Sequence, residues 1–211
     1  MKNILVIVLC LFVNNSVQSQ NYWQQNADYK ISVDVNAKKN SYKGNQEILY
    51  KNNSRDTLNK IFIHLYFNAF QPGSEMDVRS LTIKDPDRRV TDRISKLEPD
   101  EIGFLNVNTL TQDGTPLTYD VAGTVLEVSL ANPIAPGEST TFNMDFNGQV
   151  PVQIRRSGRN NAEGVALSMT QWYPKLCEYD KDGWASNPYI GREFHGVWGD
   201  FDVKISIDTG F

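Results

Sequence analysis

Apolar and polar residues alternate along most of this chain, and this two-residue period limits its fold more than any other feature. Ile31, Val33 and Val35 are separated by polar residues, and residues 140–146 repeat the pattern far downstream. Successive side chains of a strand point to opposite faces of a sheet, so this period is typical of half-buried strands. The chain is therefore expected to be mostly β.

Turn residues separate the segments that carry the pattern. The predicted strands are residues 31–35, 42–50, 61–67, 105–110, 117–121, 125–130, 140–146 and 201–207. Asp113-Gly114 is typical of a hairpin turn between 105–110 and 117–121, and Ala122-Gly123 and Pro136-Gly137 mark later turns. Many short strands joined by turns favour an antiparallel β-sandwich or a saddle-like sheet domain.

Two irregular stretches interrupt the strands. Residues 84–101 are rich in Asp, Arg, Glu and Pro, which predicts a long surface excursion with a solvated turn at Asp85-Pro86-Asp87. Residues 149–198 are aromatic and are punctuated by glycine and proline. Loops of this length are uncommon unless they are functional. We therefore expect functional residues in the second stretch.

The first residues predict export. Lys2 precedes an apolar run at residues 4–13, which is too short to span a bilayer but fits a secretory signal, and Val17-Gln18-Ser19 fits its cleavage site. A buried N-terminal strand or helix is the weaker alternative, because the sequence turns abruptly polar after the run. We expect residues 1–19 to be removed, leaving an exported chain, periplasmic or extracellular, without an integral membrane segment.

Composition excludes some partners and some chemistry. The formal net charge of −4 argues against nucleic acid, whose phosphates require clustered Lys and Arg. Cys10 lies in the signal, so Cys177 is the single cysteine of the mature chain and cannot form an internal disulfide. No histidine stands near Cys177 in sequence, and a small buried residue is a better interpretation than a nucleophile.

Catalytic and metal-binding groups are few. His64 and His195 belong to no H-E-x-x-H helix and to no cluster with zinc-ligand spacing. His64 lies inside a predicted strand and is expected to be a hydrogen-bonded structural residue, and packing is also the expected role of His195. Asp85-Pro86-Asp87 lacks the further oxygens that a calcium site requires. The chain is therefore expected to hold no catalytic residue, metal or cofactor of its own.

Several longer motifs resemble a known family. They are residues 64–70 (HLYFNAF), 153–159 (QIRRSGR), 171–175 (QWYPK), 187–194 (NPYIGREF) and 197–201 (VWGDF). Together they resemble the N-terminal region of secreted bacterial relatives of aminopeptidase N, the zinc aminopeptidases of gluzincin type in peptidase family M1. The resemblance extends over nearly all of the mature chain.

The resemblance implies a β-rich N-terminal domain that packs on a thermolysin-like catalytic domain. That domain would bind zinc through H-E-x-x-H and a downstream Glu and would contain a G-x-M-E-N strand, none of which this sequence contains. Residues 20–211 would then form a non-catalytic domain, incomplete at its C-terminal end, that shapes the cavity for a peptide substrate.

The resemblance also suggests two substrate-binding residues. In the family, a loop of this domain places a Gln beside the N-terminal amine of the substrate, often with an acidic or amide residue two positions later. Gln171 matches the first position, whereas Tyr173 occupies the second and cannot supply a carboxylate's charge. The alternative is that Trp172 and Tyr173 simply cap the core of the sandwich.

A different class of function stays open at this point. An exported β-sandwich containing Trp23, Trp172, Trp184 and Trp198 could present aromatic platforms to a glycan. The alternative to a peptidase domain is therefore a carbohydrate-binding or adhesion module.

Overall fold

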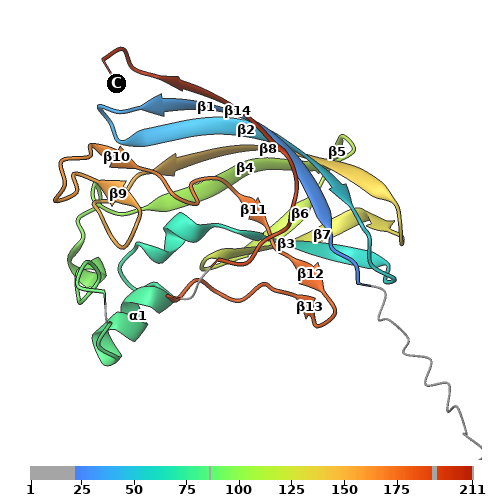
Figure 1. Ribbon diagram of the computed structural model, residues 1–211, viewed down its shortest axis with the longest axis horizontal. Helices are drawn as coiled ribbons and strands as arrows, with labels where there is room; N and C mark the ends of the chain where they lie inside the picture. The colour runs from blue at the N-terminus through green and yellow to red at the C-terminus, as the bar shows by residue number, and fades with distance from the viewer. Residues whose placement is uncertain (1–21, 86, 192–193, 211) are drawn as a thin grey trace, which may run out of the picture.

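Two β-sheets lie on either side of a shared apolar core (Figure 1). The computed structural model describes residues 22–85, 87–191 and 194–210, so the predicted signal at residues 1–19 lies outside the described residues. The fold is mostly β with antiparallel sheets, as the alternation of the sequence predicts. No helix within these ranges is long and apolar enough to cross a membrane.

The larger sheet has six strands in the order β14-β1-β2-β8-β4-β5. Its strands are β1 (Asn26–Asn36), β2 (Ser41–Lys51), β4 (Phe104–Gln112), β5 (Thr115–Pro116), β8 (Ser139–Gln149) and β14 (Phe201–Ile207). Neighbouring strands run antiparallel, except that β14 runs parallel to β1. The last described strand therefore lies beside the first described one.

The smaller sheet has four antiparallel strands in the order β11-β3-β7-β6. They are β3 (Leu58–His64), β6 (Thr118–Ala122), β7 (Val125–Ile134) and β11 (Lys175–Leu176). The other elements are the strand pairs β9 (Gly158–Arg159) with β10 (Leu167–Ser168) and β12 (Tyr179–Asp180) with β13 (Gly183–Trp184), helix α1 (Glu75–Thr82), and the 3-10 helices η1 (Tyr66–Ala69) and η2 (Ile94–Lys96).

The core forms because alternate residues of each strand point between the sheets. Phe142, Met144 and Phe146 of β8 are buried, as their shared face predicts, and Ile61 and Ile63 of β3 are fully buried opposite them in the same core. Burying a side chain of this kind contributes about 1.5–3 kcal/mol. The two-residue period of the sequence therefore accounts for most of the core.

The hairpin at Asp113-Gly114 is shorter than the sequence suggests. It joins β4 to β5, and only two residue pairs connect these strands. Pro116 has no N–H to extend the ladder, and β6 crosses to the other sheet, where it pairs with β7. Leu117 still donates its N–H to the Leu110 carbonyl at 3.0 Å, but residues 118–122 pair with β7, so the predicted pairing of residues 117–121 with residues 105–110 is wrong beyond Leu117.

The predicted strand at residues 61–67 is too long. β3 ends at His64, and Tyr66–Ala69 form η1 instead. Leu65, Tyr66 and Phe67 are all buried, so no alternation of faces continues through them. The chain turns here and brings Tyr66 to the cavity described below.

Strand β14 carries an exposed apolar row at the edge of the larger sheet. Phe201, Val203, Ile205 and Ile207 are between 41% and 60% exposed, although their register partners at alternate positions of residues 29–35 in β1 are buried. Register partners on parallel strands share one face of a sheet. The core-facing side of the sheet therefore extends beyond the part that the smaller sheet covers. We call these four residues the β14 row.

Candidate functional site

Segments from five parts of the chain line one cavity of about 110 Å³. Its aromatic wall consists of Tyr66, Phe70, Tyr189 and Phe194. Its other lining residues are Asp87, Arg89, Arg155, Arg156, Ser157, Thr170, Gln171 and Gly191. We call it the Gln171 cavity, and most of it comes from the long stretch at residues 149–198 in which functional residues are expected.

Ring contacts fix the aromatic wall. Tyr66 packs edge-on against Phe194, with ring centroids 4.7 Å apart, and against Tyr189 at 5.3 Å. The ring of His64 stacks on the ring of Tyr66, with ring centroids 4.7 Å apart. Aromatic pairs at such distances add about 0.5–1.5 kcal/mol beyond area burial. The aromatic wall is therefore preformed and does not depend on a bound ligand.

Two polar residues of the cavity have a left-handed backbone. The φ angle is 56° at Arg155 and 58° at Gln171. Positive φ occurs at six described non-glycine residues, three of which are Asn or Asp, the types that tolerate it best. Of the remaining three, two line this cavity. Backbone strain of about 1–3 kcal/mol per residue is typical of ligand sites.

Gln171 carries an unsatisfied acceptor. Its Oε1 is buried and has no hydrogen-bond partner among the described residues. Leaving a buried polar atom unpaired costs about 1–3 kcal/mol, and native structures contain few such atoms. The predicted substrate-binding residue therefore lies in a cavity, on a strained backbone, with an amide oxygen that no described group uses.

Tyr173, the second predicted substrate-binding residue, points into an aromatic cluster. Its ring packs edge-on against Tyr29 at 5.7 Å, Trp172 at 5.5 Å and Phe201 at 5.9 Å. Burial raises the pKa of Tyr173 to about 12. Gln171 therefore lines the cavity, whereas Tyr173 does not.

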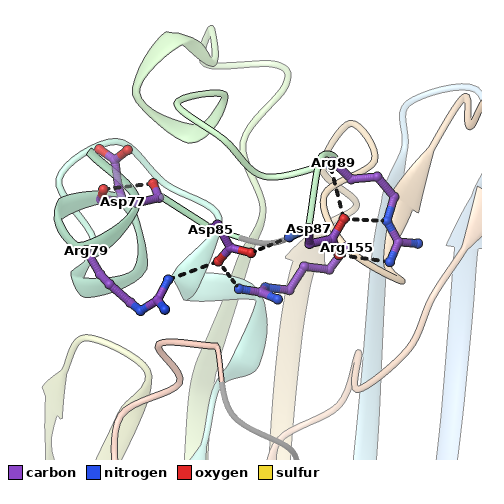
Figure 2. A network of polar contacts seen from close by, with 7 residues as sticks. Asp77, Arg79, Asp85, Asp87, Arg89 and Arg155 are labelled. Atoms are coloured by element: carbon purple, nitrogen blue, oxygen red, sulfur yellow. Dashed lines mark hydrogen bonds and ion pairs between the residues drawn. The ribbon is translucent and has the colours of Figure 1, made fainter. Parts of the chain in front are cut away.

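Asp85 is buried, so the prediction of a solvated turn at Asp85-Pro86-Asp87 is wrong for this residue. Its side chain is 2% exposed, and Oδ2 accepts hydrogen bonds from Arg79 Nη1 at 3.0 Å and from Arg155 Nη2 at 2.6 Å (Figure 2). Its Oδ1 accepts from the Asp87 N–H at 2.9 Å. Two guanidinium groups offset the desolvation of this carboxylate, because paired buried charges recover part of its cost.

Asp87 and Arg89 form a separate pair at the cavity. The Nε and Nη2 of Arg89 each lie 2.9 Å from a carboxylate oxygen of Asp87 (Figure 2). These hydrogen bonds, with a smaller effect of the Arg155 charge, lower the pKa of Asp87. The Asp87 carboxylate is thus ionised, and both of its oxygens already accept hydrogen bonds from Arg89.

The remaining reactive side chains lie outside the cavity. Cys177 is fully buried, as predicted, and burial raises the pKa of its thiol. His64 is also buried and hydrogen-bonds to the Ala185 backbone, as expected for a structural histidine, while its Nδ1 has no partner among the described residues. His195 is largely exposed, with Nε2 3.8 Å from an oxygen of Asp180. No three His, Cys, Asp or Glu side chains in the described ranges are grouped to hold a metal ion.

Most tryptophan rings pack against other rings of the chain. Trp23 stacks on Tyr179, Trp172 contacts Tyr42 and Phe146, and Trp184 contacts Phe62 and Tyr179. Trp198 differs, being 70% exposed. Trp198 lines one cavity together with Trp23 and the exposed Tyr22.

Comparisons with known proteins give structural neighbours only. No protein-family model matches the chain, and no curated protein matches it. Similar solved structures include an M1 zinc metallopeptidase from Deinococcus radiodurans, at 14% identity and a TM-score of 0.48, covering 87% of this chain and 32% of that one. A mutant from the same organism bound to Tyr-Ser-Ala substrate has the same identity and TM-score and is covered over 33% of its length.

A third similar structure is a mutant of a two-domain M1 zinc metallopeptidase bound to L-arginine, at 13% identity and a TM-score of 0.49. It is covered over 33% of its length by 88% of this chain. This chain thus spans about a third of the length of the structures that it matches.

Proposed function

We propose that this chain is the non-catalytic N-terminal domain of an exported zinc aminopeptidase, and that the Gln171 cavity receives the N-terminal end of a peptide substrate. The observation that carries the proposal is the unpaired Oε1 of Gln171. A protonated amine is a donor that would satisfy this acceptor. The resemblance of residues 171–175 to the family's amine-binding loop supports the same role.

Zinc chemistry would belong to a domain outside this chain. The sequence has no H-E-x-x-H motif, and the described residues contain no group that fits a metal ion. What the chain's own residues would contribute is binding: Gln171 would orient the amine, and the aromatic wall would exclude water from around it. Such positioning aids a reaction that occurs elsewhere.

The β14 row supports the presence of a further domain. Four partly exposed apolar side chains continue the core-facing side of the larger sheet. Covering apolar surface stabilises an interface. We assign this row to contact with the rest of the longer protein, including its catalytic domain.

The glycan-binding alternative receives less support. Rings that stack on a sugar have to be open, whereas Trp172 and Trp184 each pack against other aromatic rings. Trp198 lines one cavity together with Trp23 and Tyr22, but the described residues of this cavity contain no unpaired buried polar atom of the kind that Gln171 carries. We therefore prefer the peptide as ligand.

Replacing Gln171 with alanine in the full-length protein tests the proposed function. We expect kcat/KM for aminoacyl reporter substrates to fall by a factor that corresponds to about 1–3 kcal/mol, chiefly through KM, because the amide binds ground state and transition state alike. The melting temperature should stay the same or rise, since the variant removes an unsatisfied buried oxygen. Both quantities come from steady-state kinetics and thermal unfolding.

Gln153→Ala is the matched control, because Gln153 lies in the same long stretch but outside the cavity lining. It should leave kcat/KM unchanged. If Gln171→Ala and Tyr173→Phe both leave kcat/KM unchanged while lowering the melting temperature, the loop is structural and the proposal fails.

A further inference from the structure

Arg155 is held in position from two sides. Its Nη2 donates to Asp85, which also accepts from Arg79 and from the Asp87 backbone (Figure 2). On another side lies Gly191, where an added Cβ would come within 2.7 Å of Nη2. The arginine side chain is only 17% exposed. A guanidinium fixed in this way loses little freedom when it binds a ligand.

The same guanidinium has unused donors. Arginine offers five N–H groups, and the hydrogen bond described for this one runs from Nη2 to Asp85. Its Nε is buried and has no partner within the described residues. An unpaired N–H on a charged group is costly to bury. The planar fork of an arginine matches a carboxylate, which can accept two parallel hydrogen bonds.

Among the described residues around Arg155, guanidinium groups outnumber the carboxylates that pair with them. Asp85 is shared between Arg79 and Arg155, so one negative charge faces two positive charges. Asp87 is engaged by two hydrogen bonds from Arg89. Positive charge in a partly desolvated cavity attracts an anionic group more strongly than it would in water.

Arg155 and Gln171 therefore present complementary unused groups in one cavity. Each has a strained backbone, the first carries an unpaired donor and the second an unpaired acceptor. A ligand that satisfies both has an amine and a carboxylate close together.

We propose that Arg155 binds a carboxylate in the Gln171 cavity, so that the protein selects ligands with a carboxylate near a free amine. That the ligand is a peptide rests on the proposed function. The substrate class is then peptides with an N-terminal acidic residue. The other source of the same chemistry is the free C-terminal carboxylate of a dipeptide.

The test compares substrates that differ only in the carboxylate. In the full-length protein, kcat/KM is measured for glutamyl and glutaminyl reporter substrates, and for a dipeptide of neutral residues and its C-terminal amide. We expect the wild type to prefer one carboxylate-bearing member by about 10- to 100-fold, the size of one charge-assisted contact. Arg155→Gln should abolish that ratio, which is taken within each variant so that a general loss cancels.

Two further variants separate specificity from structure. Arg79→Gln removes the other guanidinium on Asp85 but lies outside the cavity, so the ratio should persist, reduced only in part because Asp85 then pairs with Arg155 alone. Arg155→Lys keeps a cation for Asp85 without the planar fork, and its ratio should be intermediate. A preference for the glutamyl over the glutaminyl substrate shows that Arg155 binds a side-chain carboxylate. A preference for the dipeptide over its amide shows that Arg155 binds the C-terminal carboxylate. No preference in the wild type, or equal ratios in Arg155→Gln and wild type, overturns the proposal.

A binding measurement separates this inference from the proposed function. Calorimetric titration of the full-length protein compares isoglutamine, the α-amide of glutamate, with glutaminamide, and a dipeptide of neutral residues with its C-terminal amide. The carboxylate-bearing member of one pair should bind at least about tenfold more tightly, and Arg155→Gln should lose this difference. If that member is preferred but no peptide is hydrolysed, the aminopeptidase proposal fails and the carboxylate site stands. If peptides are hydrolysed and Gln171→Ala weakens this, but both members of each pair bind alike and no substrate ratio appears, only the carboxylate site fails.

Discussion

Replacing Asp85 with asparagine should lower the free energy of unfolding by about 3–5 kcal/mol, because removing one partner of a buried ion pair leaves uncompensated charge. Asp85 is 2% exposed and accepts from both Arg79 and Arg155. Without the carboxylate, the two guanidinium groups would face each other, and one link between α1 and the cavity loop would be lost. Urea unfolding followed by tryptophan fluorescence measures the change.

Asp87→Asn is the control for this prediction. Asp87 pairs with Arg89, whose side chain is 46% exposed, and a pair in contact with water contributes about 1 kcal/mol or less. Unfolding free energies that fall equally in the Asp85 and Asp87 variants would contradict the buried network. So would a loss below about 1 kcal/mol for Asp85→Asn.

Acid should remove a second large part of the stability through His64. Burial lowers the pKa of His64 from 6.5 to about 4, and the charges of Lys175 and His195 act in the same direction, against a hydrogen bond with the Ala185 backbone. The unfolded chain therefore takes up a proton near pH 6.5, whereas the folded chain resists protonation until about pH 4. The stabilisation is complete above pH 6.5 and is lost as the pH falls to 4, by about 3 kcal/mol.

Comparison with His64→Gln isolates this effect. Burial raises the pKa of Glu178, so Glu178 changes stability with the opposite sign in the same acid range. Subtracting the unfolding free energies of the variant from those of the wild type at each pH cancels that contribution. The difference should shrink by about 3 kcal/mol between pH 7 and pH 4. A difference that stays constant with pH would show that His64 is not buried in the neutral form.

The strands could be predicted from sequence because local alternation determines them. Residues 31–35 and 140–146 have a strictly repeated apolar face, and both become central strands with that face buried. The motif at residues 171–175 singles out Gln171, and the structure adds its unpaired oxygen and its positive φ, while its role in substrate binding stays a prediction. The interiors of these strands therefore follow from the local sequence.

Non-local contacts could not be predicted in the same way. Asp85 sits in a polar segment that reads as solvated, and its partner Arg155 follows 70 residues later. The parallel pairing of β14 with β1 joins the two ends of the described fold, and β6 changes sheets after a two-pair hairpin. No local pattern specifies such pairings, since they depend on how complete sheets pack. The sequence therefore does not predict that Asp87, Arg89 and Arg155 line one cavity.

The central claim is that the chain belongs to a protein that removes residues from the N-terminus of peptides. The most direct measurement is a mass-spectrometric time course of a peptide, and of its N-acetylated form, incubated with the full-length protein. The account predicts stepwise loss of single N-terminal residues from the free peptide and no cleavage of the acetylated one, since blocking removes the charged amine that Gln171 would bind. Internal cleavage, equal cleavage of both peptides, or no cleavage of either would contradict it.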